Sequence, residues 1–323
     1  MFDFFGFNKE KNSSINNTEE VNIQQKSEST QDNAIARDLS VDVIDNLEYG
    51  ENMLFKYINR FGYKDFSELS FHNRRTINQN ILSFNVYDYT KLLNEISIEK
   101  VHSFINRMLE DSVPVIDKYD GVIEKIFQAG FLAFFEKNAS ETLDAAIEIF
   151  DKIRNTNNLT GLDNYYYIGI VNGDITAGLV GTKDYKTVLT MSKSTMIAEE
   201  IQKFCYRFYS KILVSENFIK QIPNVENHYN IRFIGYVRKG LKDEYEKLYD
   251  VYDGDDAETR NLKRQTQKLF ERGVSEYVAK NYYEARNNFI EVLRNNKDDR
   301  AAMEYVKACD YCRENNISEI NIL

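Results

Sequence analysis

The feature that most restricts the possible folds is an alternation of strand-like and helix-like segments between residues 79 and 254. Short apolar runs predict strands, and stretches with apolar residues every three or four positions predict helices. The predicted order is β-α-β-β-α-β-β-α-β-β-β. Helices placed between strands and hairpins are typical of an α+β domain of the ferredoxin-like, split βαβ type. The pattern therefore predicts one α+β domain in the middle of the chain.

Local signals set the expected bounds of these elements. We expect Ser140 to be the N-cap of the second helix, because serine side chains accept bonds from free helix N–H groups. Asn172, Gly173 and Asp174 form a turn signal that separates two expected strands of a hairpin. The expected helices are 98–119, 142–153 and 194–209, and the expected strands are 80–86, 122–126, 130–135, 165–171, 175–180, 211–214, 231–238 and 246–252.

Three further segments flank this domain. Residues 1–38 are rich in polar side chains, which predicts a disordered tail because little apolar surface is available to offset the ordering entropy. Residues 39–78 have helical spacing and predict a helical lead-in. Residues 257–317 predict three helices, and two of them have the spacing of one tetratricopeptide-type pair. Because a single pair cannot form a stable solenoid, this helical extension is expected to pack on its own domain or on a partner.

Charge and cysteine content narrow the class of protein. With 41 basic and 51 acidic side chains the net charge is −10, which argues against nucleic-acid binding because phosphate contacts need a dense basic surface. No apolar run approaches the roughly 18–20 residues of a membrane span. Three cysteines fit a reducing compartment. We expect a cytoplasmic protein without a transmembrane segment.

Several conspicuous residues have a simple structural interpretation. The pair Cys309 and Cys312 has metal or redox spacing, but zinc needs four ligands, so the pair is interpreted as two helix cysteines. Cys205 is expected in the core. The tyrosines at 165–167 are expected to fill a strand with one buried face. Gly173 is explained by turn geometry or by close approach of a phosphate. The acidic cluster at 253–256 is expected to cap the next helix.

Five motifs follow one another between residues 80 and 252. They are the run ILSFNVYDYT from Ile81, the run INRML from Ile105, the run GVIEKIFQAGFLAFF from Gly121, the runs IGIVNGD and AGLVG between 168 and 181, and a last hairpin with Arg232, Gly235 and Val237. In this order they resemble the class III adenylate/guanylate cyclase catalytic domain, with its patterns F-x-D-I-x-G-F-T, K-x-x-G-D-G and I-G-I-x-x-G. The resemblance implies a nucleotide cyclase-type domain.

The resemblance also implies a two-metal site, in which two aspartates hold the ions that clamp the reacting phosphate. Their positions correspond to Asn85 and Ala129. Asparagine offers an uncharged carbonyl oxygen and alanine offers no ligand, so the hard ligands that divalent ions need are missing. Asp88, three residues after Asn85, is the only nearby carboxylate that could replace one of these ligands.

The remaining positions implied by the resemblance contact the nucleotide. The ribose-orienting asparagine corresponds to Thr195, and the phosphate-stabilising arginine corresponds to Glu199, which would repel a phosphate. Lys125 matches the adenine-selecting lysine, although an exposed strand lysine is the simpler interpretation. An acidic partner of this lysine is expected near 187–190 and is missing, with Asp184 slightly upstream.

These substitutions favour a catalytically silent cyclase homologue rather than an enzyme. Such a chain would act as a regulatory or scaffold protein, as a homodimer or as a heterodimer with another cyclase-type domain, and residues 257–317 would dock a protein partner. No cofactor is expected in that case. Two alternatives stay open: an active divergent adenylate/guanylate cyclase that uses Mg or Mn, and a metal-independent purine nucleotide sensor that binds through Lys125.

Overall fold

The computed structural model describes residues 55–86, 89–127, 129–136, 138–157, 166–182, 184, 186–238 and 245–315. The tail expected at 1–38, and the lead-in up to residue 54, lie outside the described residues. Residues 55–60 are helical, as expected for the lead-in, and η1 (Phe66–Glu68) is a short 3-10 turn. The strand expected at 80–86 begins earlier, at Arg74, so residues 74–78 are strand and not helix.

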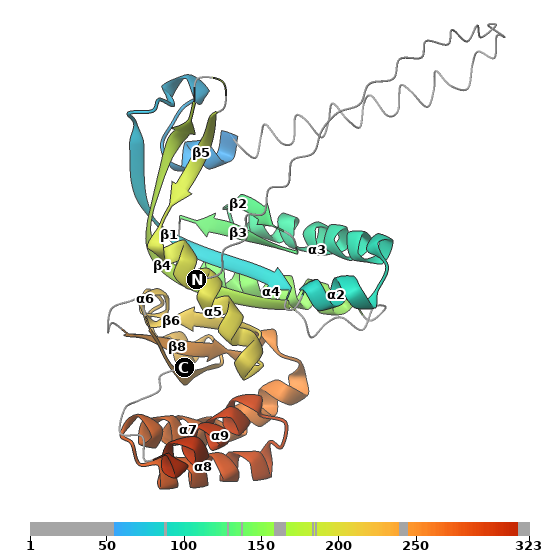
Figure 1. Ribbon diagram of the computed structural model, residues 1–323, viewed down its shortest axis with the longest axis vertical. Coiled ribbons are helices and arrows are strands. Elements are labelled where there is room, and N and C mark those ends of the chain that lie inside the picture. Colours follow the sequence, from blue (N-terminus) through green and yellow to red (C-terminus); the bar gives the residue numbers. More distant parts are fainter. Residues whose placement is uncertain are drawn as a thin grey trace, which may run out of the picture. The chain divides into compact units, whose positions relative to one another are not determined.

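The described elements follow the expected alternation (Figure 1). In chain order after η1 they are β1 (Arg74–Val86), α2 (Tyr89–Glu95), α3 (Ile98–Lys118), β2 (Gly121–Phe127), β3 (Gly130–Phe135), α4 (Ala139–Asn157), β4 (Tyr166–Gly181), β5 (Lys186–Met191), α5 (Lys193–Phe208), β6 (Ile212–Ser215), α6 (Glu216–Ile219), η2 (Val225–Asn227), β7 (Ile231–Arg238), β8 (Tyr245–Val251), η3 (Tyr252–Gly254), α7 (Ala257–Val278), α8 (Tyr282–Asn295) and α9 (Arg300–Glu314).

One sheet joins the eight strands of the described residues. Its order is β2-β3-β1-β4-β6-β8-β7, and β5 pairs with β4 outside this path. The first four strands, with α3 and α4 between them, have the arrangement of a split βαβ unit. Of the strand pairs, β4 and β6 are parallel and the others are antiparallel. The predicted α+β, ferredoxin-like fold is therefore confirmed.

The sheet is covered on both faces in its centre. One core contains residues of α3 and α4, and the other contains residues of α5 and of the helical extension. Tyr166 and Tyr167 are neighbours on β4, yet Tyr166 belongs to the first core and Tyr167 to the second, and each is at most 1% exposed. The expectation of a single buried face was wrong for these tyrosines, because β4 is a central strand.

The turn expected at 172–174 does not exist. β4 is one strand of 16 residues, and it pairs with β1 without interruption from Arg74 opposite Gly178 to Val86 opposite Tyr166. A continuous ladder on one side and the β4–β5 pair near the end of the strand outweigh the local preference of Asn-Gly for a turn. β1, β4 and β5 together extend from the sheet as an arm (Figure 1).

Glycines on β4 instead allow a helix to approach the sheet. A Cβ atom on Gly173 would lie 2.0 Å from the Ser194 Oγ atom, and one on Gly169 would lie 2.4 Å from the Ala198 carbonyl oxygen. Both contacts are with α5. Neither a turn nor a phosphate is needed to explain Gly173, because close helix packing already excludes a side chain there.

Helix caps are set by short side chains. The prediction that Ser140 is an N-cap was wrong, because α4 begins at Ala139. The Asn138 side chain accepts a hydrogen bond from the Ser140 N–H at 3.1 Å. Asp256 accepts the Thr259 N–H and caps α7, as expected for the acidic cluster. Ser192 caps α5 by accepting the N–H groups of Ser194 and Thr195.

The helical extension packs on β7 and β8 through a shared apolar core. Tyr305 of α9 donates a hydrogen bond to the Ile234 carbonyl at 2.7 Å, and its ring stacks on Phe289 of α8. Cys309 and Cys312 are buried on α9 and Cys205 is buried on α5; all three are free thiols. Within the described part of the chain, every helix falls short of the length or apolar character that a bilayer span requires.

Candidate functional site

The two positions expected to bind metal lie side by side at one end of the sheet. Asn85, near the end of β1, is paired with Gly130, and a Cβ atom on Gly130 would lie 3.0 Å from the Asn85 Oδ1 atom. Ala129 precedes Gly130 in the β2–β3 turn, and its carbonyl accepts the Val86 N–H at 3.1 Å. The fold therefore brings together the two positions that the resemblance pairs.

The chemistry at this end of the sheet does not suit a divalent cation. Ala129 is fully buried and belongs to the apolar core beside α3 and α4. Asn85 contributes an amide, which carries no charge. Among the described residues there is no group of three or more His, Cys, Asp or Glu side chains that could hold a metal ion. Asp88, the nearby carboxylate considered as a replacement ligand, lies outside the described residues.

Lys125 and Glu199 form an ion pair. Lys125 lies on β2, Glu199 lies on α5, and the Nζ and Oε1 atoms are 3.1 Å apart. Both side chains are partly exposed, at 47% and 36%. Lys125 also lies over the Phe127 ring, 5.7 Å from its centre. The resemblance implies an arginine for the phosphate at position 199, but Glu199 is an anion. This anion neutralises Lys125, the lysine that the resemblance assigns to the purine.

A half-buried polar cluster adjoins this pair. The hydroxyl groups of Tyr57 and Thr190 are hydrogen-bonded, which joins the helix at 55–60 to β5. Burial raises the pKa of the neighbouring Glu124, against the opposing effects of Lys125 and a hydrogen bond with Thr190. Burial likewise raises the pKa of Tyr57 well above its usual value. The side chains of Tyr57, Thr190 and Glu124 therefore lie close to Lys125.

Thr195 takes part in the start of α5. Its hydroxyl donates to the Ser192 carbonyl at 3.0 Å, within the first turn of the helix. Glu199 follows one turn later, so both positions lie on the helix that covers Gly169 and Gly173. Asp184 is exposed between β4 and β5, and the carboxylate paired with Lys125 is that of Glu199 instead.

Sequence reasoning missed Glu124, Thr190 and Tyr57. Glu124 could have been noticed because it precedes Lys125 directly. The β2–β3 register shifts between Ile123 and Lys125, so Glu124 lies at an irregularity in the strand pairing. The local sequence pattern does not predict this irregularity. Thr190 lies on β5, a strand that the sequence analysis did not predict. Tyr57 reaches the cluster from a helix 133 residues away in the chain, which only tertiary packing determines.

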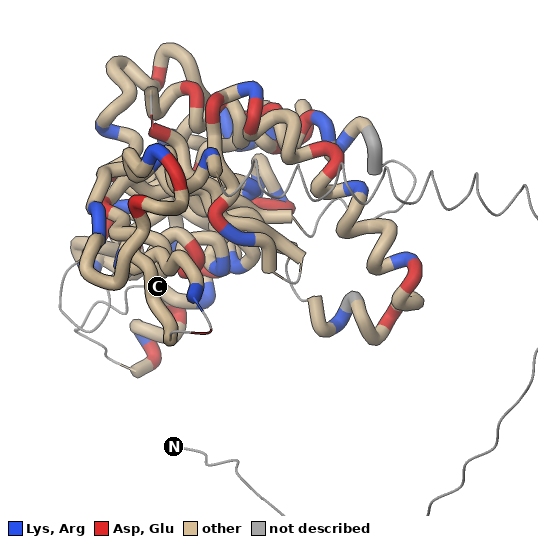
Figure 2. Tube along the Cα trace, turned by 90° about the horizontal axis from the view of Figure 1, so that it is seen from above, with Lys and Arg blue, Asp and Glu red and all other residues tan. Residues whose placement is uncertain are grey.

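Charge alone does not single out this site. Figure 2 shows basic and acidic residues interspersed along the described elements, without one continuous face of either sign. The site is distinguished instead by a particular ion pair, that of Lys125 with Glu199.

Comparison with known proteins agrees with the fold. Residues of this chain align with the terminal-differentiation-specific adenylate cyclase of Dictyostelium discoideum, at 23% identity over 232 residues. The aligned part is 69% of this chain and 11% of that much longer protein. No protein-family model matches the chain.

Solved structures show the same architecture. A bacterial light-regulated adenylyl cyclase superposes with a TM-score of 0.56 at 14% identity, covering 74% of this chain and 70% of the other. A further structure of a bacterial light-regulated adenylyl cyclase covers 59% of this chain and 98% of its own, with a TM-score of 0.50 and 14% identity. The alignment shows homology to an adenylate cyclase, and the superpositions show that this chain has the fold of the adenylyl cyclase structures.

Proposed function

We propose that this chain is a catalytically silent homologue of the nucleotide cyclases that acts as a dimerising regulatory or scaffold protein. The observation that carries the proposal is the ion pair between Lys125 and Glu199. Transfer at a phosphate is catalysed by positioning and by neutralising negative charge. A glutamate at the phosphate position works against both, and it also engages the lysine that would select the base.

The metal side of the site supports the same conclusion. Two-metal catalysis needs hard, negatively charged oxygen ligands. Asn85 supplies a neutral amide, and Ala129 supplies a methyl group buried in the core. Complementation by a partner chain could restore a composite site only if one half were intact, and here both halves are altered. We therefore propose that no metal cofactor is bound.

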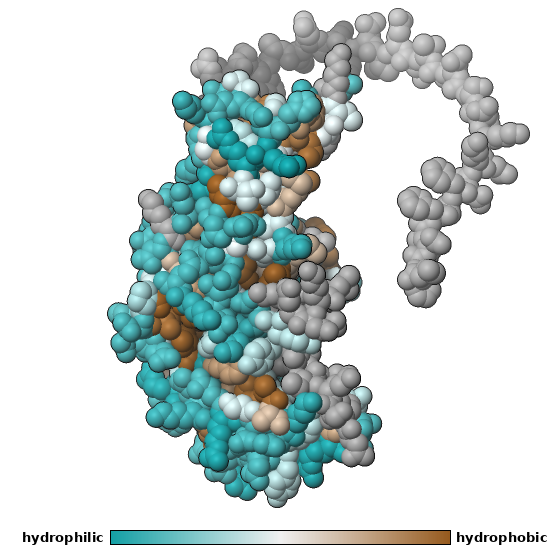
Figure 3. Space-filling model, turned by 90° about the vertical axis from the view of Figure 1, so that its left-hand side faces the viewer, coloured by the Kyte–Doolittle hydropathy of each residue, from teal (hydrophilic) through white to brown (hydrophobic). Residues whose placement is uncertain are grey.

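The arm supports a role in protein association. Leu189 and Met191 are two residues apart on β5, so they lie on one face of that strand, and they are 45% and 44% exposed. Figure 3 shows small hydrophobic areas at several heights of this face, among them the upper end, where Figure 1 draws the arm. Exposed apolar side chains that adjoin one another can form part of an association surface. We propose a second cyclase-type domain, from another copy or a related chain, as the occupant.

The test of silence is an activity and binding measurement on the purified chain. Thermal melts are recorded with ATP or GTP, each with magnesium, manganese or EDTA, together with an assay for cyclic nucleotide. We expect no product under any condition. Metal-dependent product that is lost in Lys125→Ala, but kept in the control Lys118→Ala, would overturn the proposal in favour of an active cyclase. Lys118 is an apt control because it is also an exposed lysine paired with a glutamate.

The same experiment separates the nucleotide-sensor alternative. A melting shift that persists in EDTA and disappears in Lys125→Ala would establish a metal-independent purine sensor instead of a pure protein-binding role. That result would also require the Lys125–Glu199 pair to open, so Glu199→Gln should then strengthen nucleotide binding. We expect neither effect.

Dimerisation is tested by sedimentation velocity over a concentration series. We expect self-association that is weakened at least tenfold in the double variant Leu189→Asp with Met191→Asp, because a charge on an apolar interface must be desolvated. Ile98→Asp, which changes an exposed apolar residue on α3, is the matched control and should dimerise like the unaltered chain. Unchanged association in the double variant would exclude the arm as the interface.

A further inference from the structure

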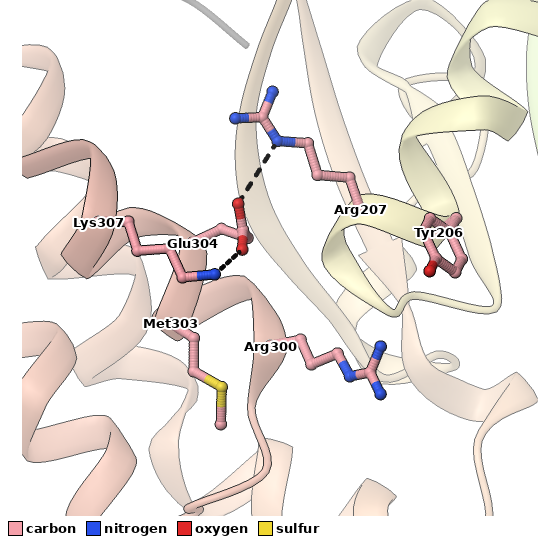
Figure 4. Close-up of a pocket in the computed structure, with 6 residues that line it drawn as sticks. All are labelled: Tyr206, Arg207, Arg300, Met303, Glu304 and Lys307. Carbon is pink, nitrogen blue, oxygen red and sulfur yellow. Dashed lines mark hydrogen bonds and ion pairs between the residues drawn. The ribbon is translucent and has the colours of Figure 1, made fainter. Parts of the chain in front are cut away.

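A groove lies between the end of α5 and the first turns of α9. It has a volume of about 480 Å³ and is lined by Tyr206 and Arg207 of α5 and by Arg300, Met303, Glu304 and Lys307 of α9 (Figure 4). The four residues of α9 are spaced three and four apart, so they form one face of that helix. The groove shares no residue with the Lys125 cluster or with the arm.

The charge of this groove is opposite to that of the chain. Three of its six residues are cations and one is an anion, so its local net charge is +2, on a chain whose net charge is −10. Glu304 is already engaged, with its Oε1 atom 2.7 Å from Lys307 Nζ and its Oε2 atom 3.9 Å from Arg207 Nε. A single carboxylate therefore leaves an excess of positive charge along the groove.

Arg300 is the cation with the least compensation. Within the described part of the chain no carboxylate oxygen lies within 4 Å of its guanidinium group. The group instead lies over the Tyr209 ring, 4.3 Å from its centre. Figure 4 shows the Arg300 side chain directed away from Glu304 and toward the end of α5. Stacking on an aromatic ring holds the guanidinium plane while its N–H groups stay available to an anion.

We propose that this groove binds an organic phosphate. Arginine presents paired N–H donors that match a phosphate group, so Arg300 would hold a phosphate, and Arg207 and Lys307, which lie beside Glu304, would add positive charge. Tyr206 and Met303 offer an aromatic ring and a flexible apolar side chain, on which the organic part of the ligand would lie. The volume falls within the range of small-molecule sites.

The binding site would couple the two parts of the chain that meet there. α5 is the helix that carries Glu199 and covers β4, and α9 belongs to the helical extension. A ligand that contacts side chains of both helices would stabilise the contact between α5 and α9. Because the groove uses different residues from the cyclase-type site, this inference does not depend on whether that site is silent.

The test is isothermal titration calorimetry of the full chain with ATP, sodium tripolyphosphate and adenosine as probes, at low and moderate salt. We expect ATP to bind, tripolyphosphate to bind more weakly and adenosine to bind weakest. Affinity should fall as salt is raised, because the attraction is electrostatic at an exposed site. Arg300→Gln should weaken ATP binding at least tenfold, and Arg207→Gln and Lys307→Gln should each weaken it by a smaller factor.

Two control variants locate the binding. Arg294→Gln removes an exposed arginine on α8, outside the groove, and Lys125→Ala removes the lysine of the cyclase-type site; both should bind ATP like the unaltered chain. Absence of ATP binding, binding that is unchanged in Arg300→Gln, or adenosine binding as tight as that of ATP would overturn the proposal. Loss of ATP binding in Lys125→Ala alone would also overturn it and would assign the ligand to the other site. Arg300 is exposed, so we expect Arg300→Gln to keep the fold. A melting curve of each variant checks this expectation.

Discussion

At the scale of single residues, the most consequential side chains are buried and charged. Arg232 on β7 has no exposed surface and contacts Asp250 through Nε at 3.0 Å and Asp299 through Nη1 at 2.6 Å. Lys263 of α7 contacts Asp250 at 2.9 Å and Asp255 at 2.6 Å. These residues join the last hairpin of the sheet to α7 and to the start of α9. Charges in such a place are costly to bury, so each depends on its partners.

We expect Arg232→Met to lower the free energy of unfolding by about 3–5 kcal/mol, because it leaves the buried Asp299 without its cation and leaves Asp250 with Lys263 alone. The measurement is urea denaturation followed by circular dichroism. Arg294→Met removes an exposed arginine paired with Glu291 and should change stability by less than about 1 kcal/mol. Equal effects of the two substitutions would show that the buried network contributes little.

The same network predicts a dependence on pH. Burial by itself would raise the pKa of Asp299, but Arg232 outweighs this effect and holds the pKa below its usual value of 3.8. The native state thus binds this proton less readily than the unfolded chain, and the contribution of Asp299 is complete above about pH 4 and is lost as the pH falls further.

Asp299→Asn should therefore destabilise the protein most at neutral pH, and the difference from the unaltered chain should shrink as the pH falls below about 4. The steepest slope for one proton is about 1.4 kcal/mol per pH unit. The check is the unfolding free energy of both proteins at a series of pH values, with the exposed neighbour Asp298→Asn as control. A difference that stays constant with pH would contradict the assignment.

At the scale of elements, the packing of α5 on β4 decides how the candidate site is built. α5 carries Thr195 and Glu199, and it reaches Lys125 on β2 because β4 has glycine where the helix crosses. The Asn-Gly signal was interpreted as a turn, since local preference favours one there. The uninterrupted ladder with β1 makes the same glycine part of a strand.

Gly169→Ala should destabilise the protein by about 1–3 kcal/mol, because its Cβ atom would overlap the backbone of α5 at Ala198. Gly178→Ala on the same strand is the matched control. Its nearest neighbouring atoms would be 3.5 Å or more from the new Cβ atom, so stability should be unchanged or slightly higher. Thermal unfolding of the two variants measures the difference. A similar loss at both positions would show that the close approach of α5 is not what requires glycine at position 169.

At the scale of the whole described molecule, sheet and extension share one core. Phe208 of α5 and Ile234 of β7 belong to the same apolar cluster as Phe270, Phe289 and Tyr305 of the extension. The Tyr305 hydroxyl crosses to the Ile234 carbonyl, and its ring stacks on Phe289 with centres 4.6 Å apart. An interface of this kind is packed like the interior of a domain.

We therefore expect β4 and α8 to lose hydrogen-exchange protection at the same denaturant concentration, as parts of one cooperative unit. Tyr305→Ala should lower the stability of both elements together by about 3–5 kcal/mol, since a large buried ring is removed. Exchange measured by mass spectrometry over a urea series provides the check. Earlier loss of protection in α8 than in β4 would show that the extension unfolds by itself.

The sequence by itself determined the alternation of elements, and with it the α+β class, because hydrophobic spacing is a local property that each helix or strand must satisfy. It also placed Asn85, Ala129, Lys125 and Glu199 as the positions to examine. The tertiary structure decided which of them meet: the Lys125–Glu199 pair, the approach of Tyr57 to Thr190, and the continuity of β4. These contacts join residues distant in the chain, and their free energies depend on burial and on ladder pairing that no local pattern encodes.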